Sequence, residues 1–355
     1  MDHVVITDFL ITLFSSVQPR RHRVIFGLLR RRLTVSTEYW GLRYQLLPFV
    51  GLFPQLEKTT FDEQIATLIK NGLLIEQQPN SGQLLLTDKG VVAQQEYHKY
   101  HYQVQYMPLT TQPLANIRQF REAFWLANQI ISETAYHNKR YYPLQIDVKT
   151  KMLVKKWYRQ TDKSHLIDNW LMALTQFLKQ LDQQTANQFV ATWVGHQVPG
   201  RNADQLGLPA TWTTTDFYLW EFDLFIFWSQ TLLQSNSNSE LKQLWQLTQQ
   251  QQNLSPSVQL TCQQVHQGLS MATISKQRRL KIGTVREHLL TAAVWLPKTD
   301  FPYDLFLTSE TLRYLQEHLT GNIDDWQLAD IRTSDNPDEF FVFRLYEIYL
   351  TKQGA

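Results

Sequence analysis

The side chains best suited to chemistry in this sequence lie close together near its C-terminal end. Basic, small and hydrogen-bonding residues gather there in a pattern that suits contact with the phosphates and base edges of DNA. The candidate DNA-binding residues are Lys276, Arg279, Lys281, Gly283, Thr284, Arg286 and His288. Glu287 stands among them, so the exposed chemistry of this segment is mixed.

The spacing of the apolar residues around this cluster predicts two short helices joined by a turn. Ser270 can cap the first helix, which would run to about Arg278 with Ile274 facing inward. Val285 and Leu289 are four residues apart, and this spacing lays one apolar stripe along a second helix. The pattern is typical of a helix-turn-helix, whose second helix enters the DNA major groove. A plain helical hairpin within a bundle has the same spacing and stays open as an alternative.

The run GLSMATISKQRRLKIGTVREHL (268–289) resembles the helix-turn-helix of two groups. One is the output domain of response regulators, and the other is the small C-terminal domain of some RecQ helicases and of YpbB-like proteins. The resemblance to the second group is closer, because the run keeps Ile-Ser-Lys-Gln-Arg before the turn and Thr284-Val285 in the next helix. Ser275 stands where such motifs prefer Ala, and Arg279 where they prefer Gly. A positive φ in the turn would cost energy at Arg279.

In order and length the whole chain resembles the YpbB-like family of low-GC Gram-positive bacteria. The resemblance implies a non-enzymatic accessory protein of a RecQ-family helicase in DNA repair or recombination. The implied partners are the helicase and DNA, and the implied location is the bacterial cytoplasm, in association with the nucleoid. A DNA-binding transcription regulator and a protein-interaction scaffold that ignores DNA are the two alternatives.

Motifs of catalysis and of cofactor binding are missing from the sequence. It contains no phosphate-binding loop, no dinucleotide-binding glycine pattern, no nucleophile elbow and no His-Glu-x-x-His. His98 and His101 share one helical face, but a third metal ligand would have to be Glu96 or a distant residue, so a solvated helix end is the preferred interpretation. We therefore predict a protein that is not an enzyme and has no cofactor and no metal.

The composition predicts a folded chain with nearly balanced charge. Lys and Arg number 34 against 32 Asp and Glu, so nucleic-acid binding must come from local patches. The single cysteine, Cys262, allows no internal disulfide and favours a reducing cytoplasm. The N-terminus lacks the basic region of a signal peptide, and Glu221 and Asp223 interrupt the most apolar run, 217–228. No contact with a membrane is expected.

The remaining pattern predicts a mainly α protein with three domains. Residues 1–107 would form a winged-helix-like domain, 114–252 a helical bundle and 255–352 a domain of five short helices that carries the helix-turn-helix. In the first domain, Thr60 and Glu63 are expected to form a capping box at the start of a helix. Residues 73–87 are expected to form a β-hairpin.

A second basic cluster opens a helix expected at 20–33. Arg20, Arg21 and Arg23 would stand at its N-terminal end, where the helix dipole disfavours cations. They form a candidate patch for a phosphate or an acidic partner, with a solvated helix face as the alternative. In the winged-helix-like domain, Asp62 and Glu63 would repel phosphate, so a protein-binding role is favoured for that domain.

Overall fold

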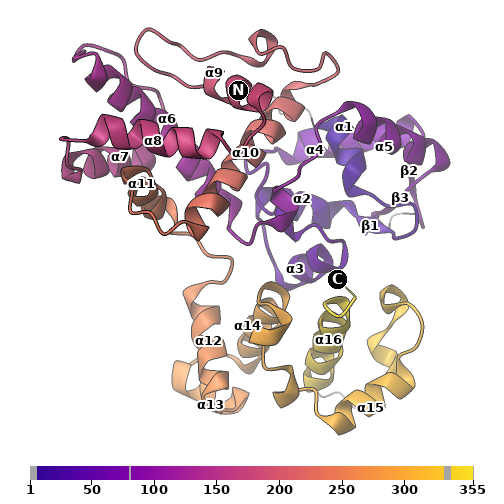
Figure 1. Cartoon of the computed structure of the whole chain (residues 1–355). Coiled ribbons are helices and arrows are strands. Elements are labelled where there is room, and N and C mark those ends of the chain that lie inside the picture. Colours follow the sequence, from indigo (N-terminus) through magenta and orange to yellow (C-terminus); the bar gives the residue numbers. More distant parts are fainter. Residues whose placement is uncertain (1–5, 80, 332–336, 355) are drawn as a thin grey trace. The chain divides into compact units, whose positions relative to one another are not determined.

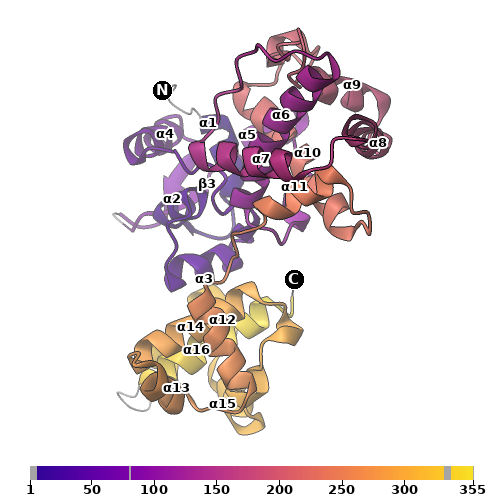
Figure 2. The same cartoon turned by 90° about the vertical axis from the view of Figure 1, so that its left-hand side faces the viewer.

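The computed structural model describes residues 6–79, 81–331 and 337–354 (Figures 1 and 2). Within these residues the fold is mainly helical, as predicted, and it has a small three-stranded antiparallel sheet near the N-terminus that includes the predicted hairpin. The chain divides into two compact units. The large unit comprises Met1–His22 and Pro48–Gln251, and the helix-turn-helix unit comprises Arg23–Leu47 and Gln252–Ala355.

The N-terminal part of the large unit contains the sheet. Its strands are β1 (Arg20–Arg21), β2 (Leu74–Glu76) and β3 (Gln83–Leu86), in the order β1-β3-β2. β2 and β3 form the predicted hairpin, with Ile75 opposite Leu85. Among the described residues α1 (Thr7–Leu10) comes first, α4 (Lys58–Lys70) precedes the hairpin and α5 (Asp88–Tyr100) follows it.

Two local predictions in this region are wrong. Arg20 and Arg21 do not open a helix, because Arg20 pairs with Leu84 in the sheet, and α2 (His22–Arg30) begins only at His22. Thr60 does not cap α4, since that helix begins two residues earlier and its N-cap, Glu57, makes no side-chain capping bond to any described residue. Helix α4 ends before Asn71-Gly72, where Gly72 takes a φ of +69° that reverses the chain.

The rest of the large unit is the predicted helical bundle. Its helices are α6 (Leu114–Ala135), α7 (Val148–Gln160), α8 (Leu166–Leu178), α9 (Gln183–Ala191), α10 (Thr214–Gln234) and α11 (Glu240–Thr248). Trp228 lies at the centre of an aromatic core, where its ring stacks on Phe177 with centroids 4.4 Å apart and meets Phe124 edge-on at 4.7 Å. The buried tryptophans of this bundle fill its core.

Helix α10 buries carboxylates as well as aromatic rings, and each of these has partners. Asp223 accepts hydrogen bonds from the backbone N–H groups of Gln105 and Met107, both at 2.7 Å. Asp216 lies 2.8 Å from Nδ1 of His101. His101 is therefore part of a buried polar network, and the expected solvated helix end is wrong at this residue.

The C-terminal part of the helix-turn-helix unit contains five α-helices among the described residues. They are α12 (Pro256–His266), α13 (Met271–Arg278), α14 (Ile282–Trp295), α15 (Ser309–His318) and α16 (Pro337–Thr351). Residues 324–331, whose sequence also suggests a short helix, instead form two 3₁₀ turns, Ile323–Asp325 and Leu328–Asp330. Trp326 breaks the helix, because its backbone is extended and its ring stacks on Tyr346 at 5.8 Å.

Helix α3 (Val35–Arg43) completes this unit although it lies far away in the sequence. It packs against α14 and α16. The buried carboxylate of Glu38 accepts hydrogen bonds from Oγ1 of Thr291 at 2.9 Å and from Nε1 of Trp295 at 3.0 Å. The compact unit thus includes residues 23–47 in addition to the expected domain 255–352. The division into three separately folding domains stays a prediction.

Candidate nucleic-acid interface

The turn between α13 and α14 is closed by specific hydrogen bonds. Ser270 caps α13 by accepting from the backbone N–H of Thr273 at 3.2 Å, as predicted. Arg279 ends the helix in the left-handed conformation, with φ +53°. Ser275 spans the turn: its hydroxyl donates to the carbonyl of Leu280 at 2.7 Å, and its own carbonyl accepts from the Leu280 N–H at 3.0 Å. The serine that departs from the family pattern therefore stabilises the turn that contains the strained arginine.

The inward faces of the two helices pack as the spacing predicted. The side chains of Ile274, Val285 and Leu289 are fully buried in one apolar cluster, together with Val258 and Cys262 of α12. This core fixes which face of α14 points to solvent. Its first two turns expose Lys281, Gly283 and Glu287.

The N-terminus of α14 is open to a ligand. Its N-cap residue, Lys281, makes no side-chain capping bond to any described residue, and its first turn holds no acidic residue. A Cβ atom added at Gly283 would meet no described atom within 4 Å. The first backbone N–H groups of a helix carry partial positive charge, so this end favours an anion such as a phosphate.

Three of the predicted cations lie close in sequence to this helix end. Lys276, Arg279 and Lys281 fall within six residues, and their side chains are exposed. In the part of the chain that the structure describes, none of the three forms an ion pair. They can reach a phosphate without breaking a bond of the fold.

Two other predicted residues are engaged by the fold. Nε of Arg286 lies 2.7 Å from the carboxylate of Asp338 in α16. Nδ1 of His288 lies 2.8 Å from Oγ1 of Thr261 in α12. Burial, with a contribution from the nearby Arg278 guanidinium, lowers the pKa of His288, so its ring is neutral at pH 7. Binding of DNA by Arg286 or His288 stays a prediction that requires these contacts to open.

Arg278 has a structural role that the sequence analysis missed. Its guanidinium donates to the carbonyl and the hydroxyl of Ser257 at 3.1 and 2.7 Å. These bonds tie the end of α13 to the start of α12. The signal was present in the spacing, because Arg278 follows the buried Ile274 by four residues and so lies on the same inner face.

The C-terminal half of the outward face of α14 is covered. Gly283, Glu287, Thr291 and Trp295 recur every four residues and share this face. Thr291 and Trp295 are bonded to Glu38 of α3, whereas Gly283 and Glu287 are exposed. Access of a ligand to α14 is therefore restricted to its first two turns, which is the part of a recognition helix that contacts bases.

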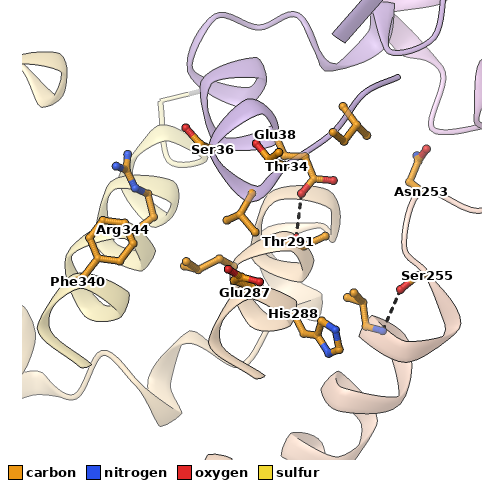
Figure 3. Close-up of a pocket in the computed structure, with 14 residues that line it drawn as sticks. Thr34, Ser36, Glu38, Asn253, Ser255, Glu287, His288, Thr291, Phe340 and Arg344 are labelled. Atoms are coloured by element: carbon orange, nitrogen blue, oxygen red, sulfur yellow. Dashed lines mark hydrogen bonds between the residues drawn. The ribbon is translucent and has the colours of Figure 1, made fainter. Parts of the chain in front are cut away.

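A hollow of about 710 Å³ lies beside the covered half of α14, among α3, α12 and α16. Figure 3 shows Glu38 bonded to Thr291, with Glu287 and His288 further along α14 and Phe340 and Arg344 on α16. Burial raises the pKa of Glu38, while its hydrogen bonds from Trp295 and Thr291 act in the opposite direction. With two glutamates facing one arginine, the lining does not favour an anion.

The three arginines of the predicted patch, Arg20, Arg21 and Arg23, lie on different elements and differ in their exposure. Arg20 donates from Nη1 to the carbonyl of Leu13 at 2.8 Å, so part of its guanidinium serves the fold. Arg21 lies in β1, and Arg23 is exposed on α2. Binding of a phosphate or an acidic partner by these residues stays a prediction.

Comparison with known proteins agrees with this geometry. A family model described as a helix-turn-helix domain matches residues 257–346, which run from α12 into α16. The C-terminal part of the chain is thus a helix-turn-helix domain. The chain is also a distant relative of Protein YpbB from Bacillus subtilis (strain 168), with 26% identity over 193 residues, or 52% of this chain and 53% of that protein.

The chain thus matches about half the length of this curated relative. No solved structure matches the chain. Among the described residues, no helix is both long enough and apolar enough to span a membrane. The same residues contain no group of three or more His, Cys, Asp and Glu side chains that could hold a metal ion.

Proposed function

We propose that this protein is a non-enzymatic accessory protein that binds DNA through the start of α14 and assists a RecQ-family helicase in DNA repair or recombination. The exposed cluster of Lys276, Arg279 and Lys281 beside an uncapped helix N-terminus carries the DNA part of the proposal. Cations and free backbone N–H groups in one place are what phosphate contacts require.

The helicase part of the proposal has separate support. The run 268–289 resembles the C-terminal domain of RecQ helicases, and the helix-turn-helix domain and the relative YpbB are consistent with this resemblance. A helicase that lacks such a domain would receive it here on a second chain.

DNA binding is tested by fluorescence anisotropy of the full chain with a labelled duplex at several salt concentrations. We expect Lys276→Gln/Lys281→Gln to weaken binding and to reduce the slope of log K against log salt by about 1.8, since each lost contact to duplex phosphate removes about 0.9. The matched control is Lys179→Gln/Arg313→Gln, which removes two exposed charges elsewhere. Equal affinity and slope in the two variants would rule out this surface.

The helicase is tested by affinity capture from native lysate with the tagged full chain and identification of bound proteins by mass. Recovery of a RecQ-type helicase supports the proposal, and its absence refutes the helicase part while leaving the DNA result untouched. Point variants are preferable to a truncation at Leu254, because removal of the C-terminal helices would expose Tyr39 and Trp40 of α3.

A transcription regulator is the less favoured function. Such a protein would read bases through side chains such as Arg286 and Lys281. Arg286 is paired with Asp338, which leaves Lys281 as the one exposed basic side chain of this pair. A scaffold that ignores DNA would not bind the duplex at any salt concentration. A regulator would prefer one DNA sequence, so the same anisotropy series, run with duplexes of different sequence, separates all three functions.

A further inference from the structure

A strongly basic segment of the chain lies in the large unit, outside the helix-turn-helix sequence. Residues 139–163 contain eight Lys and Arg and two Asp, a formal charge of +6, whereas the whole chain carries only +2. Five of these cations stand on one helix, α7: Lys149, Lys151, Lys155, Lys156 and Arg159. The sequence analysis did not single out this helix.

These cations all lie on the outward half of α7. Its opposite face buries Thr150, Val154 and Trp157 against the bundle, and Figure 2 shows α7 beside α6. All five cations are exposed, and within the described residues none of them forms an ion pair. Lys149 and Arg159 are ten residues apart, or ~15 Å along the helix, which matches about four phosphates of a stacked strand at ~3.4 Å each.

The acidic residue nearest in sequence does not neutralise this surface. Asp147 caps α7 and accepts from the backbone N–H groups of Lys149 at 2.8 Å and Thr150 at 3.2 Å. The carboxylate of Asp147 is therefore engaged in capping the N-terminus of α7. The outward half of the helix presents cations with two apolar side chains, Val148 and Met152, exposed between them.

The aromatic ring of Tyr142, just before α7 in the sequence, is exposed to solvent. The side chain of Tyr142 is 96% exposed, although its backbone is held in place. The buried amide of Gln129 donates to the carbonyl of Tyr142 at 3.1 Å and accepts from the N–H of Leu144 at 2.9 Å. A ring that is so exposed on an anchored backbone contributes nothing to the core and is available for stacking.

We propose that the outward face of α7, together with Tyr142, is a second nucleic-acid site that binds single-stranded DNA. The cations contact the phosphates, and the ring of Tyr142 stacks on an unpaired base. Basic residues beside an exposed aromatic ring are the usual means of binding single strands without sequence preference. A duplex fits less well, because its bases are already stacked and leave the tyrosine without a partner. This site goes beyond the proposed function and does not depend on it.

The test is fluorescence anisotropy of the full chain with a labelled oligothymidine of about 20 nucleotides, which exceeds the ~4–16 nucleotides covered by one single-strand-binding module. We expect Tyr142→Ala to weaken binding about tenfold and Tyr142→Phe to bind normally, since phenylalanine keeps the stacking face. Lys151→Gln/Lys155→Gln should reduce the salt slope by about 1.4, since each contact to a single strand contributes about 0.7. Because Tyr142 is exposed, its loss should leave the circular dichroism spectrum unchanged.

The matched control is Lys179→Gln/Arg313→Gln, which carries the same charge change at two exposed positions outside both proposed sites and should leave oligothymidine binding unchanged. Unchanged binding in both the tyrosine and the α7 lysine variants would overturn the proposal. Loss of binding in the lysine variant but not in Tyr142→Ala, with an equal loss of heparin binding, would also overturn it and indicate an acidic partner instead. Either result leaves the duplex experiment on α14 to be judged separately.

Discussion

Arg279 takes a backbone conformation that its side chain disfavours. A left-handed residue other than Gly costs ~1–2 kcal/mol, and Arg279 has a φ of +53°. Its side chain is exposed and makes no contact that would repay this cost within the described residues. Strain of this kind is often retained where a side chain serves binding.

Arg279→Gly is therefore expected to stabilise the helix-turn-helix unit and to weaken DNA binding. Glycine removes the left-handed strain but increases the freedom of the unfolded chain, so the net gain in the free energy of unfolding should be up to about 1 kcal/mol. Urea denaturation and duplex anisotropy measure the two effects. Arg279→Lys keeps both the charge and the left-handed strain, so it should change neither the free energy of unfolding nor the affinity for duplex by much. A glycine variant that is destabilised would show that the strain is not there.

Glu221 in α10 should give the large unit a pH-dependent stability. Burial raises the pKa of this carboxyl from 4.5 to about 7, although Arg121 acts in the opposite direction. Between these values the folded protein keeps a proton that the unfolded chain has released, so the free energy of unfolding contributed by this group falls as the pH rises. The stabilising contribution of Glu221 is fully present below about pH 4.5 and is lost above about pH 7.

Urea denaturation at a series of pH values measures this effect. Glutamine at position 221 cannot release a proton in either the folded or the unfolded state. The Glu221→Gln variant should therefore lack this part of the decrease in the free energy of unfolding with rising pH. Identical pH profiles for the variant and the natural sequence would show that Glu221 titrates normally.

At the scale of elements, α3 packs against α14 and α16, which lie more than 200 residues away in the sequence. Glu38 holds the hydroxyl of Thr291 and the indole N–H of Trp295. Glu38→Ala would leave both donors without an acceptor, at roughly 1–3 kcal/mol each. We expect the free energy of unfolding of the helix-turn-helix unit to fall by about 2–4 kcal/mol.

Chemical denaturation followed by circular dichroism measures this loss. Glu317→Ala on α15 is the matched control, because Glu317 is exposed and its removal should cost less than about 0.5 kcal/mol. If the two variants are equally stable, α3 does not contribute to the unit in solution.

The elements that could be predicted are those fixed by neighbours in the sequence. Ser270, Ile274, Val285 and Leu289 define α13, the turn and α14 through capping and spacing alone. The packing of α3 could not be predicted, because the Glu38–Thr291 bond joins residues 253 positions apart. The pairing of Arg286 with Asp338 has the same cause, since 52 positions separate them.

Strand β1 was missed for a different reason. It has only two residues, Arg20 and Arg21, which is too short for any periodic pattern to appear. Its strand conformation comes from pairing with β3, and local propensity would not produce it. The cations of α7 are visible in the sequence, but only the burial of Thr150, Val154 and Trp157 shows that they share the outward half of the helix.

At the scale of the whole molecule, two proposed sites bind two forms of DNA. A duplex with a single-stranded tail carries both ligands on one molecule, and the second contact then forms at high effective concentration. We expect such a DNA to bind at least about tenfold more tightly than the duplex or the single strand alone. Anisotropy with the three labelled DNAs measures the difference.

The variants give this comparison its control. Tyr142→Ala and Lys276→Gln/Lys281→Gln should each reduce the affinity for the tailed duplex to that of one site. A tailed duplex that binds no better than the separate DNAs would show that one chain does not hold both forms at once.

The position of α3 in the chain has a consequence for biosynthesis. Residues 35–43 leave the ribosome early, but α14 and α16, which cover Tyr39 and hold Glu38, are translated some 250 residues later. At ~5–20 residues per second this is a delay of about 12–50 s. During that time the apolar side of α3 lacks its final partners, so the nascent chain presents a natural site for chaperones until translation ends.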